Sequence, residues 1–344
     1  AMSSATTPKV GVLVLNWNGR QLLEDFAPSW VTHTPGYAEL VIIDNGSTDE
    51  SLSFLQSAYP EVKVLAFEEN YGFAEGYNRA ITALDYPYVV LLNSDAALSA
   101  GWLDEALQLL ETEPELGAVQ PKIRALRAPE AFEYAGAAGG YIDALGYPFC
   151  RGRLLDTVEV DRGQYDEPSE LLWASGACLI VRRSVYLELG GLDTRFFAHQ
   201  EEIDLCWRMV SRGWRIRLAP SGVVYHLGGG SLSAESPRKV FLNFRNNLLM
   251  LYKNLPTPRL YLVLLLRLIL DAVAALVYLL QGRPRHAVAV LRAWRGFLIL
   301  RPHYELPRGN NMRARRTDLP LPLKPYSLLL HYYLLGHRRY SQLP

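Results

Sequence analysis

The stretch ELVIIDNGSTDE, residues 39–50, is an apolar, β-branched run that ends abruptly in polar and turn-forming residues. A short apolar run bounded by Gly, Asn, Ser and Asp is typical of a buried strand that enters a tight turn. The amphipathic stretch SLSFLQSAY follows it directly. We therefore predict a strand, a loop and a helix in immediate succession.

The same pattern occurs on both sides of this stretch. Apolar runs begin at residues 9, 62 and 88, and each ends in polar residues: KVGVLVLNWNG, VKVLAFEEN and YVVLLNSDA. Helical patterns over residues 21–30 and 74–84 separate them. Strands that alternate with helices through short loops predict an α/β fold with a mostly parallel sheet and helices on both faces. Ligands of such sheets bind beyond the carboxyl ends of the strands.

Farther along the chain the pattern weakens and then returns. Residues 124–170 are richer in Gly, Ala, Pro and acidic residues, and we predict irregular structure or a hairpin there. Strand character returns in WASGACLIVRR at 173–183 and in a last strand at about 215–225. Between them, residues 201–214 predict a helix with an acidic first turn, as the helix dipole favours.

Composition excludes several classes of protein. The chain has 344 residues, 49% of them hydrophobic and 20% charged, which excludes a disordered tail. Its three cysteines, Cys150, Cys178 and Cys206, lie far apart without a CxxC pair, so we expect neither a disulfide framework nor a structural zinc site. The first residues lack a charged segment followed by an apolar run, so we expect no secretory signal and a cytoplasmic location.

The net charge of +0 hides a strong asymmetry. Residues 1–236 hold 17 Lys and Arg against 32 Asp and Glu, whereas residues 237–344 hold 18 against 3. We therefore predict two regions, an acidic domain over 1–236 and a basic, apolar helical region over 237–344. Aliphatic and aromatic blocks lie between the basic residues of the second region, which favours an anionic membrane surface over nucleic acid as its partner.

The longest apolar run is LYLVLLLRLILDAVAALVYLL at 260–280. It is long enough to span a bilayer, but Arg267 and Asp271 interrupt it at i,i+4 spacing. A charge at mid-bilayer costs roughly 3 kcal/mol on insertion scales. We therefore favour a helix that lies in the membrane interface or packs in a helical hairpin, with residues 286–300 as the second arm and 327–335 as a further contact. A soluble bundle or an oligomer interface is the alternative, and the oligomeric state stays open.

Polar residues that follow the predicted strands are the candidate ligand-binding groups. Asp44 and Asn45 end the second strand, although an Asx-turn would also explain an acidic residue there. A second loop carries amides for polar recognition and small residues that let a ligand approach the backbone closely. A third set of polar residues follows the fourth strand. These two sets are Asn70, Gly72, Phe73 and Asn78, and Asn93, Ser94 and Asp95.

The acidic cluster at the start of the 201–214 helix consists of Glu201, Glu202 and Asp204. Compensation of the helix dipole would explain one or two of these residues without any chemistry. A functional interpretation is that one of these carboxylates acts as a general base, which takes a proton from a reacting group. Crowding of like charge raises the proton affinity of one member, which suits a base near neutral pH.

The order of these motifs resembles the inverting glycosyltransferases of family two, which have the GT-A fold, and most closely their bacterial rhamnosyltransferase-like branch. The resemblance covers roughly residues 9–250. It rests on VIIDNGSTD, NYGFAEGYNRA, LLNSDA, WASGACLIVRR, EEIDLCWR and the segment around His226.

The resemblance implies a donor site and a metal. In the family an acidic residue matching Asp44 contacts the nucleotide base, and Asn16, Asn18 and Asn78 would line the same pocket. The family's Asp-x-Asp element corresponds to Asn93-Ser94-Asp95, so its first Asp is Asn here. Asp95 is then the implied ligand of Mg²⁺ or Mn²⁺, ions that suit oxygen ligands and keep phosphate oxygens in their shell. His226 aligns with a histidine that some members use as a further ligand.

The resemblance also implies the base and the acceptor site. The family's base position is Glu202 here, whereas Glu201 and Asp204 would orient the loop or bind acceptor hydroxyls. Trp173 and Gly176 lie where the family places its acceptor, although core packing explains Trp173 almost as well.

The resemblance thus implies metal-dependent, inverting transfer of a sugar from a nucleotide-sugar donor. Thymidine-diphosphate rhamnose is the first expected donor and a uridine-diphosphate hexose the second. The expected acceptor is a lipid-linked or cell-surface glycan at the inner face of the cell membrane. The alternatives are a nucleotidyltransferase, which would need a basic phosphate-binding loop that NWNG lacks, and a non-catalytic scaffold that binds sugar nucleotides.

Overall fold

The computed structural model describes residues 7–228 and 236–344. Its first part consists of the predicted alternation of strands and helices: β1 (Val10–Asn16), α1 (Arg20–His33), β2 (Ala38–Asn45), α2 (Ser51–Ala58), β3 (Lys63–Phe67), α3 (Phe73–Ala83) and β4 (Tyr88–Leu92). The four strands are parallel in the order β3-β2-β1-β4. Their carboxyl ends therefore meet at one edge of the sheet.

The second part of the sheet is mixed rather than parallel. β12 (Cys178–Arg182) runs antiparallel to β4, and β6 (Leu116–Ala125) and β13 (Arg215–His226) lie beyond it. β5 (Ala96–Leu98) pairs with β13, β7 (Ala128–Phe132) pairs with β6, and α4 (Asp104–Thr112) packs on β6 and β13. The register of β13 against β6 shifts between Ala219 and Val223, opposite Pro121. Proline cannot donate to a ladder, which explains an irregularity at this point.

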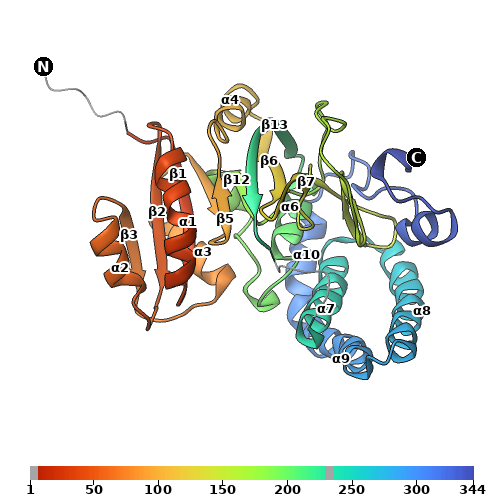
Figure 1. The fold of residues 1–344 in the computed structure, drawn as a ribbon. Coiled ribbons are helices and arrows are strands. Elements are labelled where there is room, and N and C mark those ends of the chain that lie inside the picture. Colours follow the sequence, from red (N-terminus) through yellow and green to blue (C-terminus); the bar gives the residue numbers. More distant parts are fainter. Residues whose placement is uncertain (1–6, 229–235) are drawn as a thin grey trace, which may run out of the picture.

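Helices cover both faces of the sheet, as predicted (Figure 1). Alternate residues of β1 belong to different cores: Leu13 is part of the core that includes residues of α3 and of the C-terminal helices, whereas Val12 and Val14 are part of the core that includes residues of α1 and α4. This alternation follows from the two-residue repeat of a strand. The sheet is therefore buried on both sides, and only its edges and strand ends are open to ligands.

Residues 124–170, predicted as irregular or as a hairpin, contain a small antiparallel sheet in the order β11-β10-β9-β8. Its strands are short: β8 (Gly140–Ile142), β9 (Pro148–Cys150), β10 (Arg153–Leu154) and β11 (Thr157–Val158). Strands of two or three residues leave too little periodicity to be recognised in a sequence. Between β12 and β13 follow α5 (Arg183–Glu188), the turn η1 (Thr194–Phe196) and α6 (Glu201–Ser211).

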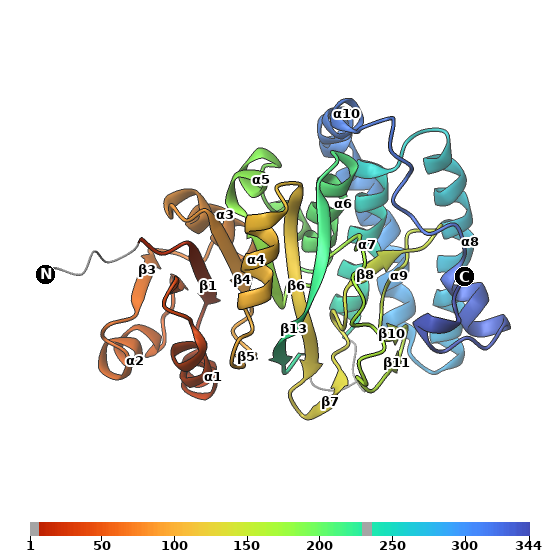
Figure 2. The ribbon, with the colours of Figure 1, turned by 90° about the horizontal axis from the view of Figure 1, so that it is seen from above.

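The C-terminal part is helical: α7 (Pro237–Asn254), α8 (Arg259–Leu280), α9 (Pro284–Leu300), η2 (Arg301–Tyr304) and α10 (Glu305–Ala314). Short helical turns, η3 (Leu330–Leu334) and η4 (Tyr340–Gln342), follow. Figure 2 shows these helices side by side at one end of the sheet. Leu248 and Leu251 of α7 share one core with Leu205 and Trp207 of α6. The boundary at 236/237 stays a prediction that rests on charge and composition.

α8 and α9 form a packed hairpin in which the two charges of α8 point inward. Arg267 and Asp271 are 2% and 1% exposed. Arg267 pairs with Asp271 at 3.4 Å and donates to the Leu145 carbonyl at 3.0 Å, while the Trp294 indole donates to Asp271 at 2.9 Å. α8 is the one helix in the described part of the chain that is long and apolar enough to cross a membrane, by length and composition only. The Arg267–Asp271 pair within this helix is explained by its contacts with Leu145 and Trp294 inside the protein.

Candidate active site

Two loops join at the carboxyl ends of β1 and β2. The Asn16 amide donates to Asp44 Oδ1 at 3.0 Å, and the Ser47 backbone N–H donates to Asp44 Oδ2 at 3.0 Å. Asn18 Oδ1 accepts from the backbone of Thr48 at 2.7 Å. The structure thus brings Asn16, Asn18 and Asp44 together, as the sequence predicts. Asp44 is only 1% exposed, so the loops hold its carboxylate in a fixed orientation.

Asn45 connects this pair of loops to the loop after β3. Its amide donates to Asn70 Oδ1 and to the Gly72 carbonyl, both at 3.0 Å, and its oxygen accepts from the Tyr71 backbone at 3.1 Å. Gly72 has φ 83°, a conformation that side chains rarely adopt. A pocket of about 250 Å³ lies against this loop, lined by Asn70, Tyr71, Gly72, Phe73, Ala74, Glu75, Thr194 and Phe197.

Asn78 does not join this group. Its oxygen accepts from the backbone of Leu192 at 3.0 Å and from the Tyr186 hydroxyl, and its amide donates to the Leu192 carbonyl at 2.9 Å. These contacts position Asn78 in the packing of α3 against the 189–192 turn. Its place in the donor pocket stays a prediction.

Asp95, His226 and Glu133 form a chain of charged groups. His226 Nε2 lies 3.0 Å from Asp95 Oδ1, and its Nδ1 lies 3.1 Å from Glu133 Oε2. Burial by itself lowers the pKa of His226, but the two carboxylates outweigh it and raise that pKa to about 9. Burial likewise opposes ionisation of Asp95, yet His226 holds the pKa of Asp95 below its usual range. The Asn93 amide lies 3.3 Å from the same imidazole.

Glu133 was not predicted, because it lies in the stretch whose sequence shows no regular pattern. Nothing in its neighbourhood, EAFEYAG, distinguishes it from other acidic residues. Only the fold brings it to His226. Of the glycine-rich segment after His226, residues 229–231 lie outside the described residues.

Glu201 and Glu202 start α6, directly after Gln200, which has φ 66°. Burial raises the pKa of both carboxyls, and the charge of Glu202 raises that of Glu201 further. Glu201 Oε2 is buried without a hydrogen-bond partner. Two adjacent carboxylates with little access to water cannot both ionise easily, which favours protonation of one of them.

Gly176 connects Glu202 to the end of β4. A Cβ at Gly176 would lie 3.3 Å from the Glu202 carboxyl carbon, so glycine leaves the space that this side chain uses. The next residue, Ala177, accepts a hydrogen bond from the Asn93 backbone at 3.0 Å. Glu202 therefore lies beside the place where β4 ends and the neighbouring β12 begins. Asn93, Ser94 and Asp95 follow β4 directly at this place. Gly176 thus lies next to the candidate base, and its predicted role in acceptor binding stays a prediction.

Trp173 is core rather than surface. It is 2% exposed, its indole donates to the Tyr141 carbonyl at 2.9 Å, and its ring packs on Gly140. A ring enclosed in this way offers no face to a sugar, so the packing alternative for Trp173 holds.

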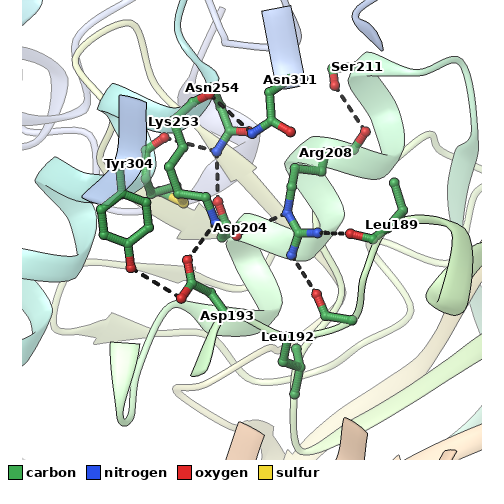
Figure 3. A network of polar contacts seen from close by, with 12 residues as sticks. Leu189, Leu192, Asp193, Asp204, Arg208, Ser211, Lys253, Asn254, Tyr304 and Asn311 are labelled. Carbon is green, nitrogen blue, oxygen red and sulfur yellow. Dashed lines mark hydrogen bonds and ion pairs between the residues drawn. The ribbon is translucent and has the colours of Figure 1, made fainter. Parts of the chain in front are cut away.

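Asp204 belongs to a buried ionic network between α6 and α7 (Figure 3). Its carboxylate accepts from Lys253 Nζ at 2.6 Å, from the Asn254 amide at 2.8 Å and from Arg208 Nε at 3.1 Å. Lys253 also pairs with Asp193 at 2.8 Å, and Arg208 donates to the Leu189 carbonyl at 2.6 Å. Asp204 is 0% exposed and fully occupied, which corrects its assignment to acceptor binding.

Replacing Asp204 by Ala is expected to lower the free energy of unfolding by about 3–5 kcal/mol, because Lys253 and Arg208 would remain buried without their counter-ion. Urea unfolding measures the effect. Asp318→Ala, which removes an exposed partner of Arg316, is the matched control and should leave the midpoint unchanged. Equal midpoints for the two variants would contradict the structural role of Asp204.

The donor set near Asp95 fits a divalent ion that is shared with a ligand. Asp95 is partly exposed and has one imidazole beside it, whereas no group of three or more His, Cys, Asp and Glu suited to an ion occurs in residues 7–228 and 236–344. Mg²⁺ and Mn²⁺ readily keep waters and phosphate oxygens in their shells, so one carboxylate and a diphosphate are a sufficient anchor. These residues do not fit an ion held by the protein alone.

A family model and a curated relative both identify the chain as a member of one protein family. Residues 8–248 match a family model described as glycosyltransferase like family 2. The chain is 31% identical over 240 residues to N-acetylglucosaminyl-diphospho-decaprenol L-rhamnosyltransferase of Mycobacterium tuberculosis, covering 64% of this chain and 76% of that protein.

Solved structures share the fold at low identity. The mannosyltransferase PcManGT from Pyrobaculum calidifontis, in complex with GDP-Man and Mn²⁺, has a TM-score of 0.52 and 17% identity over 90% of this chain and 84% of that one. S. aureus TarS 1-349 in complex with UDP-GlcNAc has a TM-score of 0.54 and 16% identity over 89% of each chain. These similarities confirm the predicted GT-A fold class.

Proposed function

The chain belongs to glycosyltransferase-like family 2 and is a glycosyltransferase, and we propose that it transfers a sugar from a nucleotide-sugar donor with inversion, using Glu202 as general base and Asp95 to anchor the donor diphosphate. The observation that carries the proposal is the placement of Glu202 and Asp95 beside the same strand ends, linked through Gly176, Ala177 and Asn93.

The proposed reaction uses the two carboxylates on different partners. Glu202 accepts the proton of the acceptor hydroxyl while that oxygen attacks the anomeric carbon. The bond between this carbon and the diphosphate breaks on the opposite side, so the configuration inverts. Asp95 would hold a divalent ion, which when bound neutralises the charge that develops on the leaving diphosphate. His226 would join as a ligand only in its neutral form, after losing the proton that Asp95 and Glu133 favour.

The loops around Asp44 would hold the nucleoside. Asp44 and Asn45 are fixed by hydrogen bonds, so the pocket along Asn70, Gly72 and Phe73 is preorganised before the donor arrives. We take thymidine-diphosphate rhamnose as the first donor to test and a uridine-diphosphate hexose as the second. The name of the mycobacterial relative supports rhamnose, and that of the TarS complex supports a uridine nucleotide.

A lipid-linked acceptor would place the protein at a membrane. The relative's name specifies a decaprenol-linked acceptor for that protein. In this chain the outer face of α8 is apolar and exposed, and α9 continues it with Leu291, Leu298 and Ile299. The exposed arginines of α9 would contact anionic headgroups. We therefore propose peripheral attachment to the inner face of the cell membrane.

Thermal unfolding with a panel of nucleoside diphosphates tests the donor site, because a ligand that binds the folded state alone raises the midpoint. Thymidine or uridine diphosphate should raise the midpoint, and Mn²⁺ or Mg²⁺ should increase the shift. If no nucleoside diphosphate shifts the midpoint with or without metal, the proposed function is wrong.

The turnover number should rise with pH on the acidic side of neutrality. Because burial raises the pKa of Glu202, the carboxyl is protonated at low pH and cannot accept the acceptor's proton. Its ionisation at higher pH restores the base, so kcat at saturating substrates increases. A profile that is flat from about pH 5 to pH 8 would contradict this assignment.

A further inference from the structure

A groove between the N-terminal halves of α7 and α9 combines an apolar floor with a cationic rim. It has a volume of about 680 Å³. The two helices that line it, α7 and α9, pack against each other (Figure 1). Phe241, Val288 and Ala289 line its floor, together with Pro237 and Pro284. Arg238, Arg285 and Arg292 complete its lining. The groove lies outside the donor site described above.

The rim arginines are available for an anionic ligand. Arg238, Arg285 and Arg292 are exposed, and the ion pairs found in the described part of the chain involve none of them. Arg285 and Arg292 are seven residues apart on α9, so they share a face with Val288 and Ala289. Three cations around an apolar floor are complementary to a ligand with a phosphate end and a hydrocarbon end.

One contact connects the lining of the groove to the lining of the pocket beside Asn70. The Arg238 guanidinium lies over the Phe197 ring, 4.8 Å from its centroid, and Phe197 lines the pocket beside Asn70 and Gly72. The Asn246 side chain of α7 donates to the carbonyls of Phe196 and Ala198, at 2.9 and 2.7 Å. The same helix therefore borders the groove and holds the loop that leads into Glu201 and Glu202.

Exposed apolar side chains also lie on α9, which lines the groove, and on α8, which packs against α9. Val288 and Leu291 of α9 are 44% and 62% exposed. The outer face of α8 exposes a long row of side chains, among them Leu262, Leu265, Ile269, Val273, Leu276 and Leu280. Apolar surface of this extent marks a contact with a partner or a lipid. A hydrocarbon chain that leaves the groove past Val288 would therefore meet Leu291, which lies about one turn farther along α9.

We propose that this groove binds the polyprenyl-diphosphate part of the sugar acceptor, with the diphosphate on Arg238, Arg285 and Arg292 and the first isoprene units on Phe241 and Val288. The inference rests on the proposed function and deepens it, because it gives the acceptor a site. The sugar at the other end of the diphosphate then extends past Phe197 toward Glu202.

Binding of farnesyl diphosphate to the full chain in solution tests the proposal, with inorganic pyrophosphate and farnesol as the two separate halves of the probe. Arg285→Glu/Arg292→Glu reverses both α9 rim charges. Arg295→Glu/Arg301→Glu makes the same change of charge on exposed arginines outside the groove and is the matched control. Thermal unfolding with thymidine or uridine diphosphate is measured on every variant, which reports both folding and the donor site.

Farnesyl diphosphate should bind at least tenfold more tightly than either half. The groove variant should weaken this binding at least tenfold, the control less than twofold, and nucleoside diphosphate shifts should be equal in all three proteins. Equal weakening by both variants would overturn the site, as would equally tight binding of a short-chain phosphatidylglycerol, which would make the groove a phospholipid site. If wild type responds to nucleoside diphosphates but does not bind farnesyl diphosphate, this inference fails while the proposed function stands.

Discussion

Replacing Glu202 by Gln is expected to lower kcat for sugar transfer by about a thousandfold, because general-base catalysis contributes roughly 10²–10⁴ to rate and glutamine cannot accept a proton. The amide is almost the same size as the carboxyl, so the space beside Gly176 stays filled. Donor binding should survive, since Glu202 acts on the acceptor. Single-turnover transfer and calorimetric titration with the nucleoside diphosphate measure the two effects separately.

The matched control is Glu201→Gln. Glu201 is the same residue type as Glu202 and precedes it directly in the sequence. Its side chain is 7% exposed, and its Oε2 has no hydrogen-bond partner. A neutral amide is tolerated there, because the pKa of Glu201 is already raised. We expect its kcat to stay within tenfold of wild type. If Glu202→Gln keeps wild-type turnover while Glu201→Gln loses it, the base is Glu201. Loss in neither variant would contradict a carboxylate base on this helix.

Replacing Asp95 by Ala is expected to abolish the increase in nucleoside diphosphate affinity that Mn²⁺ or Mg²⁺ produces, and to lower kcat/KM by about a hundredfold or more. Asp95 is the partly exposed carboxylate at the end of β4, and the preceding Asn93 cannot replace it as an anionic ligand. Titration of thymidine and uridine diphosphates with and without metal measures the effect. The control is Asp85→Ala, which lies three residues before β4 and has a side chain that is 98% exposed. An unchanged metal response in Asp95→Ala would remove Asp95 from the donor site.

The parallel half of the fold could be predicted because its strands are continuous β-branched runs that end in Gly, Asn and Asp. The strands around Val12 and Ile42 are buried on both faces and therefore show no polar interruption. β6 is harder to recognise because Pro121 lies within it and requires the irregularity in β13. The small sheet from β8 to β11 consists of strands too short to show a repeat.

The residue types at the strand ends predicted which functional groups lie close together. They did not predict which of these side chains are free to bind or react with a ligand. Glu202 and Asp204 lie two residues apart on one helix, so they point in different directions: Glu202 lies beside Gly176, whereas Asp204 turns inward to Lys253. Lys253 comes from α7, about fifty residues later, and no local pattern indicates that pairing. Asn78 and Arg267 are similar cases, since their partners are backbone and side-chain groups of distant segments.

Crystals of the full chain grown with Mn²⁺ and the nucleoside diphosphate that raises the thermal midpoint most would locate the ion directly by its anomalous scattering. The account predicts one strong peak bound to Asp95 and to the diphosphate, with the nucleoside along the Asp44 and Asn70 loops and the diphosphate facing the Glu202 carboxyl. A peak away from Asp95 would contradict this account. A diphosphate bound too far from Glu202 for that carboxylate to act at the sugar of the intact donor would contradict it as well.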